Sequence, residues 1–540
     1  MARSEADHSA AIAAVERAYP DRTLQGLLRR HARNRGDKPA VTFQGETWTY
    51  RELVEKMDKV AGALRAGGLK ADDRILYYGK NNAEFAALWG GAAVAGVVLI
   101  PVNWRLALAE IVEIGLDAGV RALFLDPEYV KHEAELRQQL PLVHTVIHCD
   151  APGPDGFAEW MGQAEPFAGD PAAEGDNSAV GLQLYTSGTT GRAKGVLLTH
   201  DTLFWQRAAS EVHGMACDFQ RPDDVLLVSL TISHVGGLVT FARAFFSGGH
   251  AVVLREFAPG PVLEAVSRYR VSRLTTVPST LQLLLEHPGV ETADVTSVHT
   301  IQYGAAPIPV ELLQKGIEVF GCQFVQVYGM TESGGTVATL APEDHTIPTT
   351  QRMKSVGRPL PTVEMRIAGS DGQPAAPGEI GEIEVKTRSI MQGYWQMPAA
   401  TADVFTADLF YKSGDAGYMD EDGYIYLCDR IKDMIVTGAE NVYPAEVEHA
   451  LFSHPDVVEA AVIGVPDERW GEAVKAIVVR RPGGTAGEAE LIEHVRSRIA
   501  RFKAPKSIDF VAELPRNAAG KVLRRKLAEP FWAGRERRIN

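Results

Sequence analysis

The sequence predicts an α/β protein in which a large N-terminal domain of layered α/β subdomains is followed by a small α+β domain. Three observations lead to this prediction. The chain has 540 residues, more than one hydrophobic core usually organises. Strand-like and helix-like patterns alternate past residue 320, which favours largely parallel sheets. The pattern then changes twice, near residue 355 and again after Arg430.

The first elements follow from local patterns. Residues 40–43 and 47–50 flank Gly45 and predict a β-hairpin. Apolar residues recur at helical spacing over 51–66, and 74–78 is a short apolar strand. These elements begin the βα alternation.

The longest apolar run, 85–100, has to be considered as a possible membrane-spanning segment. It is shorter than the roughly 20 residues that span a bilayer. It also contains three glycines and is followed by Pro101. We therefore expect a buried helix followed by a buried strand at 97–100, and no membrane span.

Residues 355–430 are rich in strands and turns and predict a β-barrel-like subdomain. The turn dipeptides are Asp371-Gly372, Pro377-Gly378 and Asp422-Gly423.

The last part of the chain predicts a compact α+β module. The expected elements are a helix starting near Pro444, strands at 457–463 and 473–479, a helix at 488–501 and a strand at 507–511. We expect an N-terminal domain over 1–430, with 355–430 as its β-rich subdomain, and a C-terminal domain over 431–540.

Composition excludes several classes of protein. The chain has 55 basic and 69 acidic residues and a net charge of −14, which argues against a nucleic-acid partner. Its four cysteines form no CxxC pair, so neither a disulfide framework nor a zinc site is indicated. The N-terminus lacks the apolar core of a signal peptide. We expect a soluble, cytoplasmic protein.

The strongest local signal is a glycine- and hydroxyl-rich string after the apolar stretch 180–184. Glycines let backbone N–H groups approach a phosphate, hydroxyls donate further hydrogen bonds, and a lysine supplies positive charge. The string carries Thr186, Ser187, Gly188, Thr189, Thr190, Gly191 and Lys194.

Two other interpretations of this string were weighed. A P-loop needs Ser or Thr directly after its Gly-Lys pair, whereas Lys194 is followed by Gly195 and Val196. A flexible surface turn would suit an arbitrary Gly/Ser/Thr loop, but it does not explain so specific a string.

Further strings follow in order along the chain. They are Ser229–Gly237, Tyr303–Pro307, Gln326–Glu332, Tyr411–Asp415, Asp429–Ile435, Gly438–Pro444 and Pro515–Arg525. Through these motifs the sequence resembles the adenylate-forming superfamily of acyl-CoA synthetases, aryl-CoA ligases, luciferases and adenylation domains of peptide synthetases. The resemblance runs from about Thr23 to Leu527.

The resemblance implies a nucleotide site and its catalytic groups. Lys521 would be the catalytic lysine of adenylate formation, Thr331 would bond the α-phosphate, and Lys194 would meet the pyrophosphate oxygens. Glu332 would help to hold Mg²⁺, together with Thr186. Further ATP or AMP contacts would come from Gly304, Ala305, Ala306, Gln326, Tyr328, Gly329, Met330, Asp415 and Arg430, of which the last two would reach the ribose.

The resemblance also implies an acyl pocket, a coenzyme A tunnel and a hinge. The acyl pocket would be lined by His234, Val235, Gly236, Gly237, Tyr303, Gly304 and Met330. The tunnel would use His234, Gly438, Ala439 and Glu440. The small C-terminal domain would be mobile, and its hinge would be Lys432. A lone histidine is more often structural, and Ser233 replaces the aromatic residue that usually precedes it.

The implied activity is that of an ATP-dependent acid–CoA ligase that uses ATP, Mg²⁺ and coenzyme A. An aliphatic or fatty acid is favoured as the substrate, and an aryl acid would also fit. The alternatives are a ligase that loads a carrier protein, an enzyme of luciferase type, and a non-catalytic nucleotide-binding protein. A homodimer is common in the superfamily.

Overall fold

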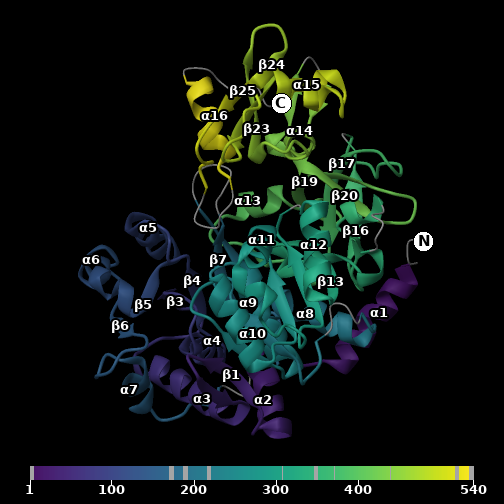
Figure 1. Cartoon of the computed structure of the whole chain (residues 1–540). Helices are drawn as coiled ribbons and strands as arrows, with labels where there is room; N and C mark the ends of the chain where they lie inside the picture. The colour runs from purple at the N-terminus through teal and green to yellow at the C-terminus, as the bar shows by residue number, and fades with distance from the viewer. Residues whose placement is uncertain are drawn as a thin grey trace. The chain divides into compact units, whose positions relative to one another are not determined.

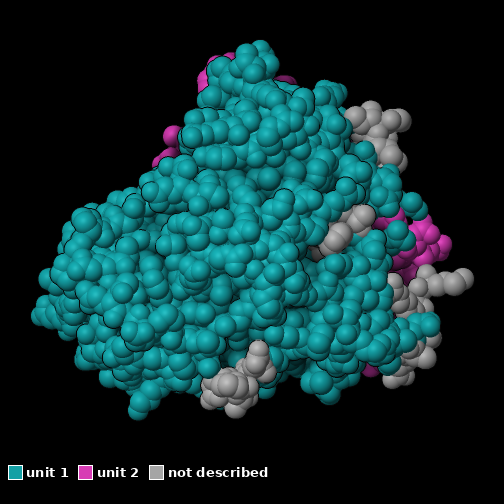
Figure 2. All heavy atoms as spheres, turned by 90° about the horizontal axis from the view of Figure 1, so that it is seen from below, with its two compact units in different colours: residues 1–364, 385–411 teal, residues 365–384, 412–540 magenta. Residues whose placement is uncertain are grey.

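A computed structural model of the chain describes residues 5–169, 175–186, 193–215, 220–306, 308–345, 351–369, 371–437, 440–516 and 522–533. The chain forms two compact units. The first holds residues 1–364 and 385–411, and the second holds 365–384 and 412–540 (Figure 2). The β-rich stretch 355–430 is thus divided almost equally between the two units. The domain division at residue 430 stays a prediction.

The first unit contains a nine-stranded sheet whose six central strands are parallel and whose edges are antiparallel. Its order is β15 (Arg358–Pro359), β14 (Gly335–Leu340), β13 (Gln323–Met330), β12 (Thr300–Gly304), β11 (Arg273–Thr276), β9 (Val225–Val228), β10 (His250–Val253), β1 (Pro39–Phe43) and β2 (Glu46–Thr49). The expected hairpin is confirmed by the antiparallel pair β1–β2.

A second sheet of the same unit has seven strands, with parallel pairing from β7 to β6 and antiparallel pairing of β7 with β8 and of β8 with β18. Its order is β18 (Gly393–Tyr394), β8 (Lys194–Thr199), β7 (Val180–Thr186), β4 (Val98–Val102), β3 (Arg74–Tyr78), β5 (Val120–Leu125) and β6 (Thr145–His148). The prediction of largely parallel sheets is confirmed.

One large core joins facing sides of the two sheets through a layer of helices (Figure 1). These helices are α2 (Leu24–Arg35), α3 (Tyr50–Ala66), α4 (Ala83–Ala95), α8 (His200–Val212) and α9 (Val235–Ser247). Parallel sheets need cover on both faces. The two sheets share this layer on their inner faces.

Other helices cover the outer faces of the sheets. The nine-stranded sheet packs against α10 (Pro259–Tyr269), α11 (Pro278–Glu286) and α12 (Val310–Phe320). The seven-stranded sheet packs against α5 (Leu108–Ala118) and α6 (Glu133–Gln139). The remaining helices of the unit are α1 (Glu5–Ala18), α7 (Phe157–Gly162) and α13 (Pro398–Asp403).

The apolar run at 85–100 forms α4 and the start of β4, as expected. Helix α4 is buried around its whole circumference, which suits a helix without a polar face. A Cβ on Gly91 would lie 2.3 Å from Cγ1 of Val60 on α3, so this glycine lets the two helices approach closely. Nowhere in the described ranges does a helix combine the length and apolar character needed to cross a bilayer.

The second unit begins with a four-stranded sheet. Its order is β16 (Glu364–Ala368), β17 (Gly381–Lys386), β19 (Tyr411–Met419) and β20 (Ile425–Arg430). Within the residues that the structure describes, the end strands β16 and β20 do not pair with each other, so the sheet is open. The expected barrel-like form is corrected to an open sheet, because four twisted strands are too few to close around a core.

The rest of the second unit is an α+β module. Its sheet contains β22 (Glu440–Val442), β21 (Ile435–Thr437), β24 (Gly471–Arg480), β23 (Val457–Asp467) and β25 (Ser507–Phe510). Helices α14 (Pro444–Phe452) and α15 (Glu488–Arg496) share one core with this sheet, while residues of α16 (Arg524–Trp532) pack in a second, smaller cluster. Alternate residues of β23 enter the two clusters, so this strand is buried on both faces. Helix α15 ends five residues before the expected Arg501.

Candidate active site

The two ends of the phosphate string lie side by side in the seven-stranded sheet. Thr186 ends β7 and Lys194 begins β8, and the two residues are partners in the antiparallel ladder. Both side chains are half-buried. The loop between them, with Ser187, Gly188, Thr189, Thr190 and Gly191, lies outside the described residues. The sheet thus holds both stems of this loop in register.

Glu332 lies on a tight turn between β13 and β14. The turn Thr331–Ser333 is a 3₁₀ helix, and the Ser333 hydroxyl donates to the carbonyl of Gly335 at 2.7 Å. Gly334 follows with φ of 62°, and a Cβ there would lie 2.0 Å from the carbonyl oxygen of Thr202. Because the backbone is fixed at both ends of the turn, the position of the Glu332 carboxylate is restricted.

A residue that the sequence did not single out connects these two parts of the site. The Tyr394 hydroxyl donates to Oε1 of Glu332 at 3.2 Å. The ammonium of Lys194 lies 4.8 Å from the centre of the same ring. Tyr394 follows Glu332 by 62 residues, and the pairing of β18 with β8 helps to place it here. No local pattern in the sequence indicates that pairing.

His234 stands at the start of α9, next to a polar partner. Nδ2 of Asn103 lies 3.2 Å from Nε2 of His234, and Oδ1 of Asn103 accepts the backbone N–H of Arg105 at 3.0 Å. Burial lowers the pKa of His234, and the positive charge of Arg105 lowers it further. His234 is therefore neutral at pH 7.

Two of the glycines expected in the acyl pocket are explained by backbone packing. A Cβ on Gly237 would lie 2.2 Å from the carbonyl oxygen of Thr231, and a Cβ on Gly304 would lie 2.3 Å from that of Val327. Gly236 differs, because the nearest atom to its Cβ would be Cδ1 of Leu230 at 3.8 Å. Of the three glycines, Gly236 alone could carry a Cβ without a close contact.

The adjacent strands β12 and β13 place their motif residues in different surroundings. Tyr303 is fully buried in the outer core of the nine-stranded sheet, where its hydroxyl lies 3.0 Å from Nε2 of His345. Gln326 is its partner in the ladder and is also buried. Ala305, with φ of 67°, and Ala306 are exposed at the carboxyl end of β12. In this arrangement Tyr303 is a packing residue, and its place in the acyl pocket stays a prediction.

Three other predicted residues form the end of β13. Tyr328 is buried, Gly329 is exposed, and Met330 packs against the large inner core. A Cβ on Gly329 would lie 1.8 Å from the carbonyl oxygen of Gly335. The glycine allows β13 and β14 to stay paired up to the Glu332 turn.

The second unit brings the two predicted ribose residues together. Asp415 on β19 and Arg430 on β20 are ladder partners, and Oδ1 of Asp415 lies 2.7 Å from Nε of Arg430. The Ser413 hydroxyl accepts the backbone N–H of Asp415 at 3.1 Å. The pair presents one carboxylate and one guanidinium at the same point of the sheet.

Several predicted residues cannot be placed in detail. Lys521, Gly438 and Ala439 lie outside the described residues. Lys432 belongs to the short turn Ile431–Asp433, whose backbone alone is described at that position, and Glu440 begins β22 with an exposed side chain. The roles of these residues stay predictions.

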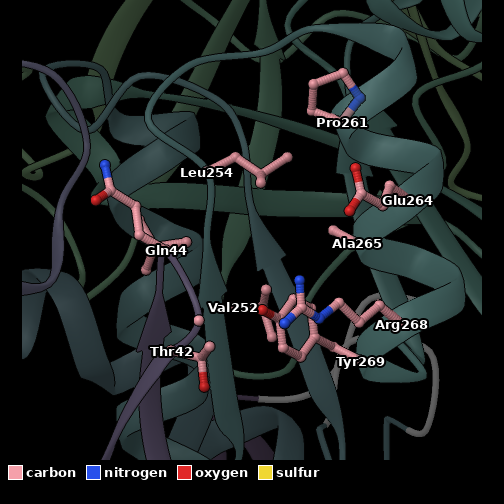
Figure 3. Close-up of a pocket in the computed structure, with 11 residues that line it drawn as sticks. Thr42, Gln44, Val252, Leu254, Pro261, Glu264, Ala265, Arg268 and Tyr269 are labelled. Carbon is pink, nitrogen blue, oxygen red and sulfur yellow. The ribbon is translucent and has the colours of Figure 1, made fainter.

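A separate hollow of about 300 Å³ lies between the β1–β2 hairpin and α10 (Figure 3). Its lining, drawn from the described part of the chain, includes none of the residues that the sequence predicts for the site. Thr42, Gln44, Glu264, Arg268 and Tyr269 provide its polar groups.

Comparison with known proteins agrees with the motifs and the fold. Residues 28–395 match the family of AMP-binding enzymes, and residues 446–521 match the AMP-binding enzyme C-terminal domain. The fatty acid–[acyl-carrier-protein] ligase ScoC of Streptomyces coeruleorubidus is 38% identical over 94% of this chain and 96% of its own. The feruloyl-CoA synthase of an Amycolatopsis species is 36% identical over 93% of this chain and 98% of its own.

Among solved structures, ATP-bound MatB from Rhodopseudomonas palustris superposes with a TM-score of 0.85 and 32% identity, covering 95% of this chain and 99% of that one. The site and fold thus define an adenylate-forming enzyme. The chain belongs to the family of AMP-binding enzymes, in which it is an AMP-forming acyl-CoA synthetase.

Proposed function

We propose that this enzyme joins a hydrophobic carboxylic acid to coenzyme A in two steps, with an aliphatic acid favoured and an aryl acid as the other option. The first step makes an acyl-adenylate and pyrophosphate from the acid and ATP. The second step transfers the acyl group to the thiol of coenzyme A and releases AMP. The observation that carries the proposal is that Lys194 and Glu332 both contact Tyr394, beside the phosphate string.

The first step overcomes the low reactivity of a carboxylate. Its oxygen attacks the α-phosphorus of ATP, the bond to the β-phosphate oxygen breaks, and AMP becomes the leaving group for the next step. Negative charge builds up at the α-phosphate in the transition state. Lys521, Thr331 and the donors of residues 186–194 would stabilise that charge, and one such preorganised donor typically contributes on the order of 3 kcal/mol.

Magnesium fits the residues that are present. Mg²⁺ prefers oxygen ligands and is usually held by one or two carboxylates together with substrate phosphates. Glu332 offers the carboxylate and Thr186 the hydroxyl, beside the loop proposed to hold the phosphates. When bound, the ion would neutralise phosphate charge. Among the described residues no group of three or more His, Cys, Asp or Glu side chains forms a metal cage.

The second step needs a nucleophile from outside the chain. A thiol of the cysteine type has a pKa of roughly 8.5 and is partly ionised near neutral pH. Its sulfur attacks the acyl carbon, and AMP leaves. We propose that Lys521 acts in the first step and the Gly438 segment in the second, with a rotation of the small domain about Lys432 between them.

The acid is expected to be largely apolar. Met330 packs on the inner core, Val235 is half-buried at the start of α9, and a Cβ on Gly236 would meet only the apolar side chain of Leu230, at 3.8 Å. The relatives described above are named for a fatty acid and for the aryl acid ferulate. Both kinds of acid therefore belong in a substrate test.

A carrier protein is the second candidate for the acyl acceptor. ScoC is named as a ligase that acts on an acyl-carrier protein, and it matches almost the whole length of this chain. The chemistry is unchanged, because such carriers also present a thiol on a pantetheine arm.

One experiment tests the acid and the acceptor together. Purified enzyme is given ATP, Mg²⁺ and a panel of aliphatic and aryl acids, with coenzyme A, with a pantetheinylated carrier protein, or with neither. We expect AMP formation that depends on one class of acid and is accelerated by coenzyme A, with acyl-CoA detected by mass spectrometry. If only the carrier protein is acylated, the acyl acceptor is the carrier protein and not coenzyme A. No acid-dependent AMP in any arm would refute the proposal.

A further inference from the structure

Tyr394 is in contact with two groups of opposite charge. Its hydroxyl donates to the Glu332 carboxylate at 3.2 Å, and its ring faces the ammonium of Lys194, 4.8 Å from the ring centre. The side chain is 7% exposed. Each charge therefore has a partner on the same ring, the cation at its face and the anion at its hydroxyl.

The backbone around Tyr394 fixes the ring from two sides. The N–H of Trp395 donates to the carbonyl of Gly195 at 2.7 Å, which ties the segment to the phosphate-loop strand β8. The N–H of Met391 donates to the carbonyl of Glu332 at 2.6 Å, which ties it to the Glu332 turn. The short strand β18 thus joins the two parts of the nucleotide site.

Two further contacts surround Tyr394, one at its hydroxyl and one at its backbone. The Tyr411 hydroxyl lies 3.5 Å from that of Tyr394, and the Tyr394 N–H donates to Oγ1 of Thr401 at 2.9 Å. In its hydrogen bond to Glu332 the Tyr394 hydroxyl is the donor, because an ionised carboxylate can only accept.

We propose that Tyr394 is a positioning residue of the adenylation step, which sets the Glu332 carboxylate and the Lys194 ammonium for magnesium-bound ATP. The inference rests on the proposed function, since it assigns Tyr394 to the nucleotide site of that reaction. A cation over an aromatic face and a hydrogen bond to a carboxylate both restrict side-chain motion. Without them, these two flexible groups would each have to be ordered when ATP binds.

The test uses Tyr394→Phe, which keeps the ring under Lys194 and removes only the hydroxyl, and Tyr394→Leu, which removes both contacts. The matched control is Tyr426→Phe, because the Tyr426 hydroxyl donates to Oδ2 of Asp420 at 3.1 Å in the second unit. Three quantities are measured for each variant: the affinity for ATP at several Mg²⁺ concentrations, the rate of each half-reaction, and the melting temperature.

For Tyr394→Phe we expect the Mg²⁺ concentration for half-maximal ATP binding to rise about tenfold, as the loss of a hydrogen bond to a charged group implies. Tyr394→Leu should also weaken ATP binding at saturating Mg²⁺. Thioester formation from supplied acyl-adenylate should stay within twofold of the wild type, and Tyr426→Phe should change none of these values.

A wild-type Mg²⁺ dependence in Tyr394→Phe would overturn the inference, as would an equal loss in both half-reactions with a lower melting temperature. The binding measurement separates this inference from the proposed function. If the wild type binds ATP with Mg²⁺ but forms no acid-dependent AMP, the proposed function fails and the binding data still decide the role of Tyr394. If the wild type binds no ATP, both are overturned.

Discussion

Asn103 and His234 form a polar pair at the start of α9, with 3.2 Å between Nδ2 of Asn103 and Nε2 of His234. Because Oδ1 of Asn103 accepts the N–H of Arg105, its Nδ2 faces the histidine and donates. Nε2 of His234 is therefore the acceptor, and the proton of the neutral ring is on Nδ1. The pair fixes both the tautomer and the orientation of the ring.

This relationship predicts a charge-sensitive pH profile for Asn103→Asp. A carboxylate beside His234 would favour the imidazolium and raise its pKa by roughly one to two units. As the pH is lowered, kcat/KM for the acid should begin to fall at a higher pH in Asn103→Asp than in the wild type. The reason is that the wild-type pKa of His234 lies below its ordinary value and the added carboxylate raises it. Asn103→Ala should lower kcat/KM by a similar factor at every pH. Superimposable profiles for Asn103→Asp and the wild type would contradict the assigned tautomer and role.

Gly236 and Gly237 offer a matched pair of substitutions. Gly237→Ala should lower the stability by about 1–3 kcal/mol, because its Cβ would meet the Thr231 carbonyl oxygen and the backbone would have to move. Gly236→Ala should leave the melting temperature almost unchanged and raise KM for longer acids. Thermal unfolding and a chain-length series measure the two effects. Equal melting temperatures would show that the close approach at Gly237 is not a constraint.

His200 should make the stability depend on pH. It is fully buried, its Nδ1 accepts the N–H of Leu24 at 3.3 Å, and burial lowers its pKa to about 4. Between pH 6.5 and pH 4 the unfolded chain binds a proton at this position and the folded chain does not. Stability is therefore lost as the pH falls, by about 1.4 kcal/mol per pH unit from this residue.

Two carboxylates act in the opposite direction, so His200 must be isolated by a variant. Burial raises the pKa of Glu84 to about 7 and that of Asp126 to about 6, and both stabilise the fold as the pH falls. In His200→Asn the amide oxygen can replace the Nδ1 acceptor. Urea unfolding at pH 7 and pH 5 should show the wild type losing about 2 kcal/mol more than the variant. The same pH dependence in both proteins would refute the assignment.

The Asp415–Arg430 pair predicts how ATP is recognised through its ribose. Asp415→Ala should raise KM for ATP at least tenfold, on the order expected for hydrogen bonds to a carboxylate. The wild type should also bind 2′-deoxy-ATP more weakly than ATP, whereas Asp415→Ala should no longer distinguish the two nucleotides. Asp422→Ala, in the turn between the same two strands, is the control. A variant that still prefers ATP would place the ribose elsewhere.

Much of the fold could be predicted from local sequence patterns. The strand at 74–78 matches β3 over its full length, and the helix at 51–66 differs from α3 by one residue. Both carry regular apolar spacing, which reports burial directly. The open form of the four-stranded sheet could not be predicted, since closure depends on how distant strands pair and not on the turns between them.

Candidate site residues can be proposed from the sequence where one string carries several of them, as at Thr331 and Glu332. Tyr394 cannot be proposed in this way, because its contact with Glu332 depends on the pairing of β18 with β8 and not on its neighbours in sequence. The glycines gave a mixed result. A Cβ on Gly236 would meet only Leu230, at van der Waals distance, while Gly237 and Gly304 serve backbone packing, which a sequence cannot distinguish from a need for pocket space.

The most direct test of the central claim is a rapid-quench measurement with α-labelled ATP, Mg²⁺ and an acid substrate, first without coenzyme A and then with it. We expect labelled acyl-adenylate to form on the enzyme only when the acid is present, and to be converted to AMP and acyl-CoA when coenzyme A is added. Lys521→Ala should form no adenylate, yet should convert supplied acyl-adenylate to acyl-CoA. Label that appears in ADP, or AMP that forms without any acid, would contradict the account.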